Sequence, residues 1–133
     1  MIQQKASIQS IVYLLLLLLL FTNISSCKNN HQDYLPGTWE MTEYRINHFD
    51  EHEDIEVTWT FMEDGTFSQL ITYPRHEVPE SGIWVMQDEQ TIMIEYPHNN
   101  MKVEWKIVYI DNALLKVEHT TPGFFVERSF KKQ

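Results

Sequence analysis

The sequence has 133 residues, with 10 Lys and Arg against 19 Asp and Glu, so its formal net charge is −9 at pH 7. This acidic balance argues against nucleic-acid binding, because phosphate contacts need a basic surface. The length fits one domain with one modest core and excludes a large multi-domain enzyme. Cys27 is the single cysteine, so the chain cannot form an intramolecular disulfide or a thiolate metal cluster.

The N-terminal segment 1–26 has the pattern of a secretory signal peptide. Lys5 precedes an uncharged run at residues 11–21, which is rich in leucine. This run is much shorter than the roughly 20 apolar residues that a spanning helix needs. A charged start followed by a short apolar centre is typical of a signal peptide, so we predict that segment 1–26 is removed.

The sequence ISSC at residues 24–27 spans the end of the signal segment and resembles the lipobox of bacterial lipoproteins. The resemblance implies that Cys27 is lipidated and becomes the new N-terminus. Two or three acyl chains on one residue give stable anchoring, because each buried methylene adds about 0.8 kcal/mol. The alternative is an ordinary signal peptide with an incidental cysteine.

Residues 27–34, the lipidated cysteine and a polar stretch without apolar periodicity, are predicted to form a tether. Lys28, directly after the cysteine, resembles the outer-membrane sorting pattern of lipoproteins. We therefore expect a lipid-anchored protein of the cell envelope, in the outer membrane. A periplasmic and a surface-facing position are both open.

Residues 35–133 predict one all-β domain. Short segments rich in β-branched and aromatic residues recur between Gly, Pro, Asn and Asp clusters, and none has a sustained helical period. Short connectors join neighbouring antiparallel strands, which favours an up-and-down β-barrel of about eight strands, closed so that no edge remains. The expected strands are 38–46, 55–62, 66–73, 82–87, 91–96, 101–110, 113–119 and 124–131.

Alternation along these strands predicts which side chains face the interior. Arg128 shares a face with Phe124, Val126 and Phe130. A charge in an apolar row is costly unless it is matched or stacked on an aromatic ring. The predicted inward aromatic residues are Trp39, Trp59, Phe61, Trp84, Tyr96, Trp105, Tyr109, Phe124 and Phe130.

Two motifs carry a family resemblance. The sequence LPGTW at 35–39 resembles the Gly-x-Trp motif that opens the first strand of lipocalins, and TFMEDGTF at 60–67 is similar to a hairpin of small lipocalin-like domains. Their order over 35–131 resembles the lipocalin-like domains of bacterial, Bacteroidota-type lipoproteins. The resemblance implies a barrel-closing contact between Trp39 and a basic side chain, here Arg128. Alternatively, Arg128 extends to solvent at the barrel rim.

An eight-stranded barrel is either filled by side chains or holds one small molecule. The many bulky rings favour a largely filled interior with a shallow cup at the open end. Loops 47–54 and 74–81 are candidates for its rim. The candidate ligand-binding residues are Arg75, His76 and His119, and a purely structural role is the alternative for His119.

Loop 47–54 also contains the candidate metal ligands His48, Asp50 and His52. Imidazole and carboxylate groups suit zinc, nickel or copper, and a spacing of four would place both histidines on one face of a helical turn. The loop lacks the glycine of a calcium-binding loop. The alternative is a solvated acidic loop that keeps the protein soluble.

Catalysis has little support in the sequence, which contains no Gly-x-Ser-x-Gly elbow, phosphate-binding glycine loop or His-Glu-x-x-His motif. We therefore predict a non-catalytic monomer without a cofactor. Its partners would be a membrane, through Cys27, and a small apolar or amphipathic molecule bound by the barrel. The alternative is a filled-barrel scaffold whose rim loops hold a protein or polymer.

Overall fold

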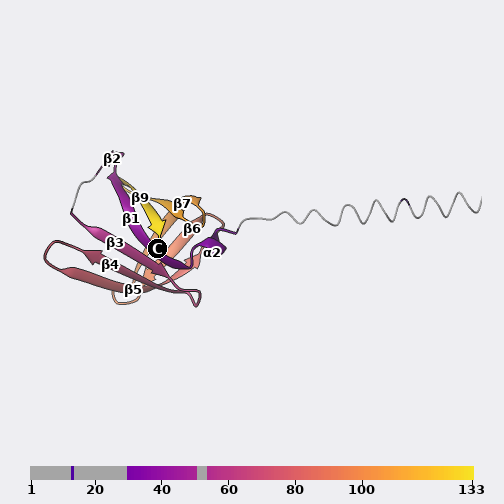
Figure 1. Ribbon diagram of the computed structural model, residues 1–133, viewed down its shortest axis with the longest axis horizontal. Coiled ribbons are helices and arrows are strands. Elements are labelled where there is room, and N and C mark those ends of the chain that lie inside the picture. Colours follow the sequence, from indigo (N-terminus) through magenta and orange to yellow (C-terminus); the bar gives the residue numbers. More distant parts are fainter. Residues whose placement is uncertain (1–12, 14–29, 51–53) are drawn as a thin grey trace, which may run out of the picture.

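A computed structural model describes residues 13, 30–50 and 54–133 of the protein. Its long strands form one antiparallel sheet in sequence order, and the sheet closes because the first strand also pairs with the last (Figure 1). The elements are α2 (His31–Tyr34), β1 (Gly37–Ile46), β2 (Phe49–Asp50), β3 (Glu56–Phe61), β4 (Thr66–Thr72), β5 (Glu77–Met86), β6 (Thr91–Tyr96), β7 (Met101–Ile110), β8 (Leu114–Thr121) and β9 (Phe124–Lys132).

The predicted all-β barrel is confirmed. Strands β1 and β3 to β9 form a closed eight-stranded antiparallel barrel, and β2 is an extra short strand that pairs with the end of β1. Among the described residues, every buried core residue lies within the range 35–130. The barrel segment therefore contains the whole core of the described chain. Among the described residues, no helix is both long and apolar enough to cross a membrane.

Strand β5 is longer than the sequence predicted, because it begins at Glu77 rather than Gly82. This stretch belongs to the predicted rim loop 74–81. The first half of β5 pairs with β4, for instance Pro79 with Leu70, whereas the pairing with β6 begins only at Ile83. A proline is tolerated here because this part of the strand is an edge, where a missing backbone donor costs little.

Aromatic rings fill one half of the barrel. Trp59 lies at the centre of this cluster, with ring centroids 4.3 Å from Phe130, 5.2 Å from Trp105 and 5.8 Å from Phe67. Such dense contact between large rings supplies both buried apolar area and favourable edge-to-face geometry. Seven of the nine predicted inward aromatic residues are buried, namely Trp39, Trp59, Phe61, Trp84, Tyr96, Trp105 and Phe130.

The other two predicted inward residues are exposed. Tyr109 is 50% exposed because a β-bulge in β7 inserts one residue between Ile107 and Tyr109 and reverses the alternation. The prediction for Tyr109 was therefore wrong, and its hydroxyl instead donates a hydrogen bond to Asp111 (2.6 Å). Phe124 begins β9 at the end of the barrel and is 58% exposed.

The two ends of the barrel differ. We call the end near Gly37 the closed end, because α2 and the segment before β1 lie across it (Figure 1). Trp39 donates a hydrogen bond from Nε1 to the Leu35 carbonyl (2.8 Å), and both residues are fully buried. The opposite, open end carries β2 and the β4–β5, β6–β7 and β8–β9 turns.

We predict that Gly82→Ala destabilises the barrel. A Cβ at residue 82 would lie 2.5 Å from the Glu95 carbonyl oxygen, which belongs to the backbone of the neighbouring strand β6. Overpacking of this kind costs about 1–3 kcal/mol, so chemical denaturation should show a free energy of unfolding that is lower by that amount. Ser81→Ala, at the exposed neighbouring position, is the control. Equal stability of the two variants would contradict the close approach.

Candidate functional site

The basic residue that crosses Trp39 is Lys132. The Lys132 Nζ lies 5.0 Å from the Trp39 ring centroid and donates a hydrogen bond to the Tyr34 carbonyl (2.9 Å). The two side chains meet because Lys132 is the register partner of Trp39 in the β1–β9 pairing. Gly37 leaves the space for this contact, since a Cβ there would lie 2.6 Å from the Lys132 Cε.

The predicted contact between Arg128 and Trp39 is therefore wrong. The register places Arg128 opposite Tyr44, near the other end of β1. The Arg128 guanidinium carbon lies 5.0 Å from the Trp105 ring centroid, 5.6 Å from that of Trp59 and 5.3 Å from that of Tyr44. Arg128 does stack on aromatic rings, which favours its charge inside the barrel, but these rings do not include Trp39.

These contacts place Arg128 inside the barrel rather than at its rim. Arg128 is on β9, Trp59 on β3 and Trp105 on β7. In the closed sheet, β1 separates β9 from β3, and β8 separates β9 from β7. A side chain on β9 can contact both rings only by crossing the interior.

Two consecutive hydrogen bonds link side chains of the neighbouring strands β3, β4 and β5. Trp59 donates from Nε1 to the Gln69 Oε1 (2.7 Å), and Gln69 donates from Nε2 to a Glu80 carboxylate oxygen (2.8 Å). Gln69 is the buried polar residue of the described core. Burial raises the pKa of the nearby Tyr96 to about 12, with a further contribution from the charge of Glu80, which Arg128 opposes. We call Tyr44, Gln69, Glu80, Tyr96 and Arg128 the interior polar cluster.

Sequence reasoning missed most of this cluster. The signal for Gln69 was present, because it alternates with Phe67 and Ile71 in the inward row of β4. Glu80 gave no comparable signal, since its segment was interpreted as a loop. Tyr44 faces inward only because of a β-bulge between Met41 and Glu43, which no local pattern announces.

The electrostatic environment of Arg128 is unusual. Its Nε is buried and has no hydrogen-bond partner among the described residues. Burial lowers the pKa of the guanidinium, and interactions with the Tyr44 and Tyr96 side chains raise it in part. The ion pairs recorded for the described part of the chain do not include Arg128. Among the described residues, this interior cation therefore has no paired carboxylate.

Inward-facing side chains near the open end keep partial exposure, in contrast to the fully buried rings of the closed half. Tyr44, Glu80 and Arg128 belong to this group, as do the apolar residues Ile71 and Val126. Solvent therefore reaches the open half of the interior. Its wall combines apolar side chains with a few polar groups, which is the composition of small-molecule sites.

The predicted rim residues do not come together. Arg75 and His76 lie in the β4–β5 turn, where the His76 ring stacks on Tyr73 with centroids 4.7 Å apart. His119 lies on β8, and its Nδ1 is 2.7 Å from the Glu104 carbonyl oxygen of β7. Strands β5 to β7 separate the two places in the sheet.

His119 occupies the gap where β7 and β8 separate. The pairing of these strands ends at Lys106 and Glu118, so the His119 side chain bridges them beyond that point. A surface hollow of about 510 Å³ adjoins it. The His119 ring also packs against Trp105, with centroids 5.3 Å apart. These contacts give His119 a structural task in the barrel wall.

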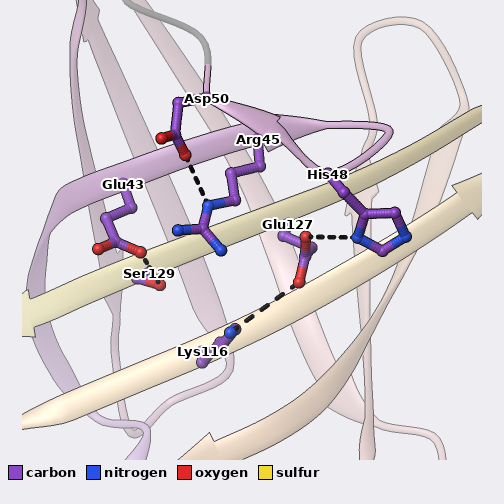
Figure 2. Close-up of polar contacts among 7 residues, drawn as sticks. All are labelled: Glu43, Arg45, His48, Asp50, Lys116, Glu127 and Ser129. Carbon is purple, nitrogen blue, oxygen red and sulfur yellow. Dashed lines mark hydrogen bonds and ion pairs between the residues drawn. The ribbon is translucent and has the colours of Figure 1, made fainter.

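The candidate metal ligands have other partners (Figure 2). The His48 Nδ1 lies 3.3 Å from a Glu127 carboxylate oxygen, and Asp50 accepts a hydrogen bond from the Arg45 Nε (2.7 Å). His52 lies outside the described residues. Within the part of the chain that the structure describes, no three His, Cys, Asp or Glu side chains form a group able to hold a metal ion.

Comparisons with solved structures support the fold. A protein from Bacteroides uniformis ATCC 8492, solved by NMR, is 20% identical, with a TM-score of 0.58 over 76% of this chain and 90% of that chain. A redesigned beta barrel is 18% identical, with a TM-score of 0.54 over 78% and 96%. Bovine odorant binding protein, in complex with a selenium-containing odorant, is 16% identical, with a TM-score of 0.51 over 77% and 72%.

The sequence comparisons add no family assignment. No model of a protein family matches this chain, and no curated protein matches it. The structural likeness therefore establishes the barrel fold, which this chain shares with natural and redesigned proteins.

We predict that Lys132→Met lowers the free energy of unfolding by about 1 kcal/mol, because it removes a cation–π contact and a hydrogen bond. Thermal denaturation measures this loss. Lys131→Met is the matched control, since Lys131 is the exposed neighbour on the same strand. If both variants have the melting temperature of the unsubstituted protein, the contact with Trp39 contributes nothing to stability.

Proposed function

We propose that this protein is a non-catalytic, lipid-anchored lipoprotein of the cell envelope whose lipocalin-like barrel binds a small apolar or amphipathic molecule. One observation carries the binding function: the open half of the barrel presents inward-facing side chains that are partly exposed and mixed in polarity. Ligand sites of small molecules share this mixture of an apolar wall and a few placed polar groups.

The structural neighbours support this proposal by analogy. Bovine odorant binding protein has a similar fold and was solved with an odorant bound. Fold alone does not determine function, so the argument depends on the interior of this chain. Here the rings around Trp59 fill the closed half, and the ligand would occupy the open half, above Trp59 and Trp105.

A second function is favoured by exposed aromatic side chains at the open end. Phe49 on β2 is 74% exposed, and Phe124 on β9 is 58% exposed. A hollow of about 610 Å³ lies between the first half of β5 and residues Pro97 and His98 of the β6–β7 turn. Exposed apolar groups are typical of interaction surfaces, and the hollow is a separate recess on another part of the same end. The alternative is therefore a scaffold that holds a protein or polymer with its rim.

Native mass spectrometry distinguishes the two functions. We expect residues 28–133, purified without delipidation, to carry the added mass of a small organic molecule, because the open half would otherwise expose apolar wall to water. The same sample after organic extraction is the control, and it should show the bare chain. If the untreated sample also shows only the bare chain and takes up no added dodecanol, the scaffold function is favoured.

The anchoring proposal is tested on Cys27, which lies outside the described residues. We expect mass spectrometry of the mature full-length protein to find Cys27 as the N-terminal residue, with acyl chains attached. Cys27→Ala should abolish the acyl mass, and Asn29→Ala, two residues beyond the lipobox, should retain it. A mature chain that starts elsewhere and carries no acyl group would refute lipidation.

The envelope location is part of the same proposal. Lipidated Cys27 would hold the barrel at a membrane, and residues 27–34 would separate the two. Lys28 favours the outer membrane. The barrel would then meet its ligand in the periplasm or at the cell surface.

A further inference from the structure

We infer that the molecule bound in the open half carries an anionic head group, of the carboxylate type, and that Arg128 receives it. This inference rests on the proposed binding function, because it concerns the charge of the ligand that the barrel holds. Two features of Arg128 carry it: its unmatched charge and its position in the interior, among aromatic rings.

The first feature is the unmatched charge. The chain has 19 acidic residues, yet the ion pairs of the described residues use Arg45, His48, Lys102, Lys106 and Lys116, and none uses Arg128. Glu80 is the carboxylate of the interior polar cluster, and it accepts its hydrogen bond from Gln69. No carboxylate of the described residues therefore neutralises Arg128, which leaves its charge to an anion from outside them.

Stability alone does not explain an arginine at this position. A buried donor without an acceptor destabilises the folded state, and the Arg128 Nε is such a donor. Apolar residues that replace buried charges are often neutral or stabilising. The rings of Tyr44, Trp59 and Trp105 offset part of the cost, since they attract the cation. An anionic ligand at the exposed part of the guanidinium would supply the missing countercharge.

The chemistry of the guanidinium selects the head group. Aromatic rings pack around Arg128, whereas the five N–H donors of a guanidinium point outward in its own plane. Two parallel donors match the two oxygens of a carboxylate. The Tyr44 ring packs against the same guanidinium, with its centroid 5.3 Å from the Arg128 Cζ, so the site presents aromatic surface beside its charge.

The surrounding wall suits the rest of such a molecule. Ile46, Ile71 and Val126 are apolar, face the interior near the open end and are partly exposed. An alkyl chain that extends from a head group at Arg128 toward the open end would contact these side chains. The occupant is thus a single-chain amphiphile with its charge inside and its tail toward the mouth.

Three probes of equal chain length test the inference: dodecanoate, dodecanol and dodecyltrimethylammonium. They are titrated into residues 28–133, the two ions below their micelle concentrations and dodecanol below its solubility limit. Tryptophan fluorescence reports binding, because Trp59 and Trp105 contact Arg128. We expect dodecanoate to bind at least tenfold more tightly than dodecanol, and the cation to bind least. Arg128→Met should remove the preference of dodecanoate over dodecanol, and Arg128→Lys should retain part of it.

Glu80→Gln is the matched charge variant in the same interior. It removes the negative charge that faces the cluster, so dodecanoate should bind this variant more tightly while dodecanol is unaffected. Circular dichroism checks that each variant is folded. If Arg128→Met does not fold, the head-group preference of the unsubstituted protein and of Arg128→Lys decides the question.

The outcomes separate the two proposals. Equal binding of dodecanoate and dodecanol, or a preference for the cation, overturns the inference about Arg128 and leaves the binding function intact. A dodecanoate preference that survives Arg128→Met also overturns it. If none of the three probes binds, the proposed binding function fails, and the inference fails with it.

Discussion

The pairing of β1 with β9 is the constraint on which the rest of the structure depends. It closes the sheet, and its register determines which side chains of the last strand meet which residues of the first. Lys132 is placed over Trp39 at the closed end, and Arg128 is placed opposite Tyr44 in the open half of the interior. The same register thus gives Lys132 a structural contact and leaves Arg128 inside the barrel.

The β-bulge in β1 refines this assignment. Strict alternation from Trp39 would bring Glu43 and Arg45 to the interior. The extra residue between Met41 and Glu43 reverses the faces, so that Tyr44 points inward. Figure 2 shows Glu43 and Arg45 in the outer polar network instead, where Glu43 accepts a hydrogen bond from Ser129 (3.4 Å). The interior avoids two charges and gains a ring that contacts Arg128.

Local sequence pattern predicted the fold and much of the core, because period-two alternation and short turns are local properties. It could not predict which cation crosses Trp39, since that depends on a register between residues about ninety positions apart. The bulge before Tyr109 and the edge position of Pro79 are further cases in which pairing with a neighbour overrides local pattern. The interior polar cluster joins residues of β1, β4, β5, β6 and β9, so only the closed barrel brings it together.

The first half of β5 pairs with β4 but not with β6, and this free edge affects how copies of the chain meet. A barrel has no free sheet edge except where a strand outruns its neighbour, and Glu77–Ser81 is such a stretch on the side of β6. Unpaired backbone of this kind recruits strands from other molecules. Pro79 removes a donor from it, and Glu77 makes identical edges repel one another electrostatically. Two copies of the chain that meet at this edge therefore repel one another before their strands can pair.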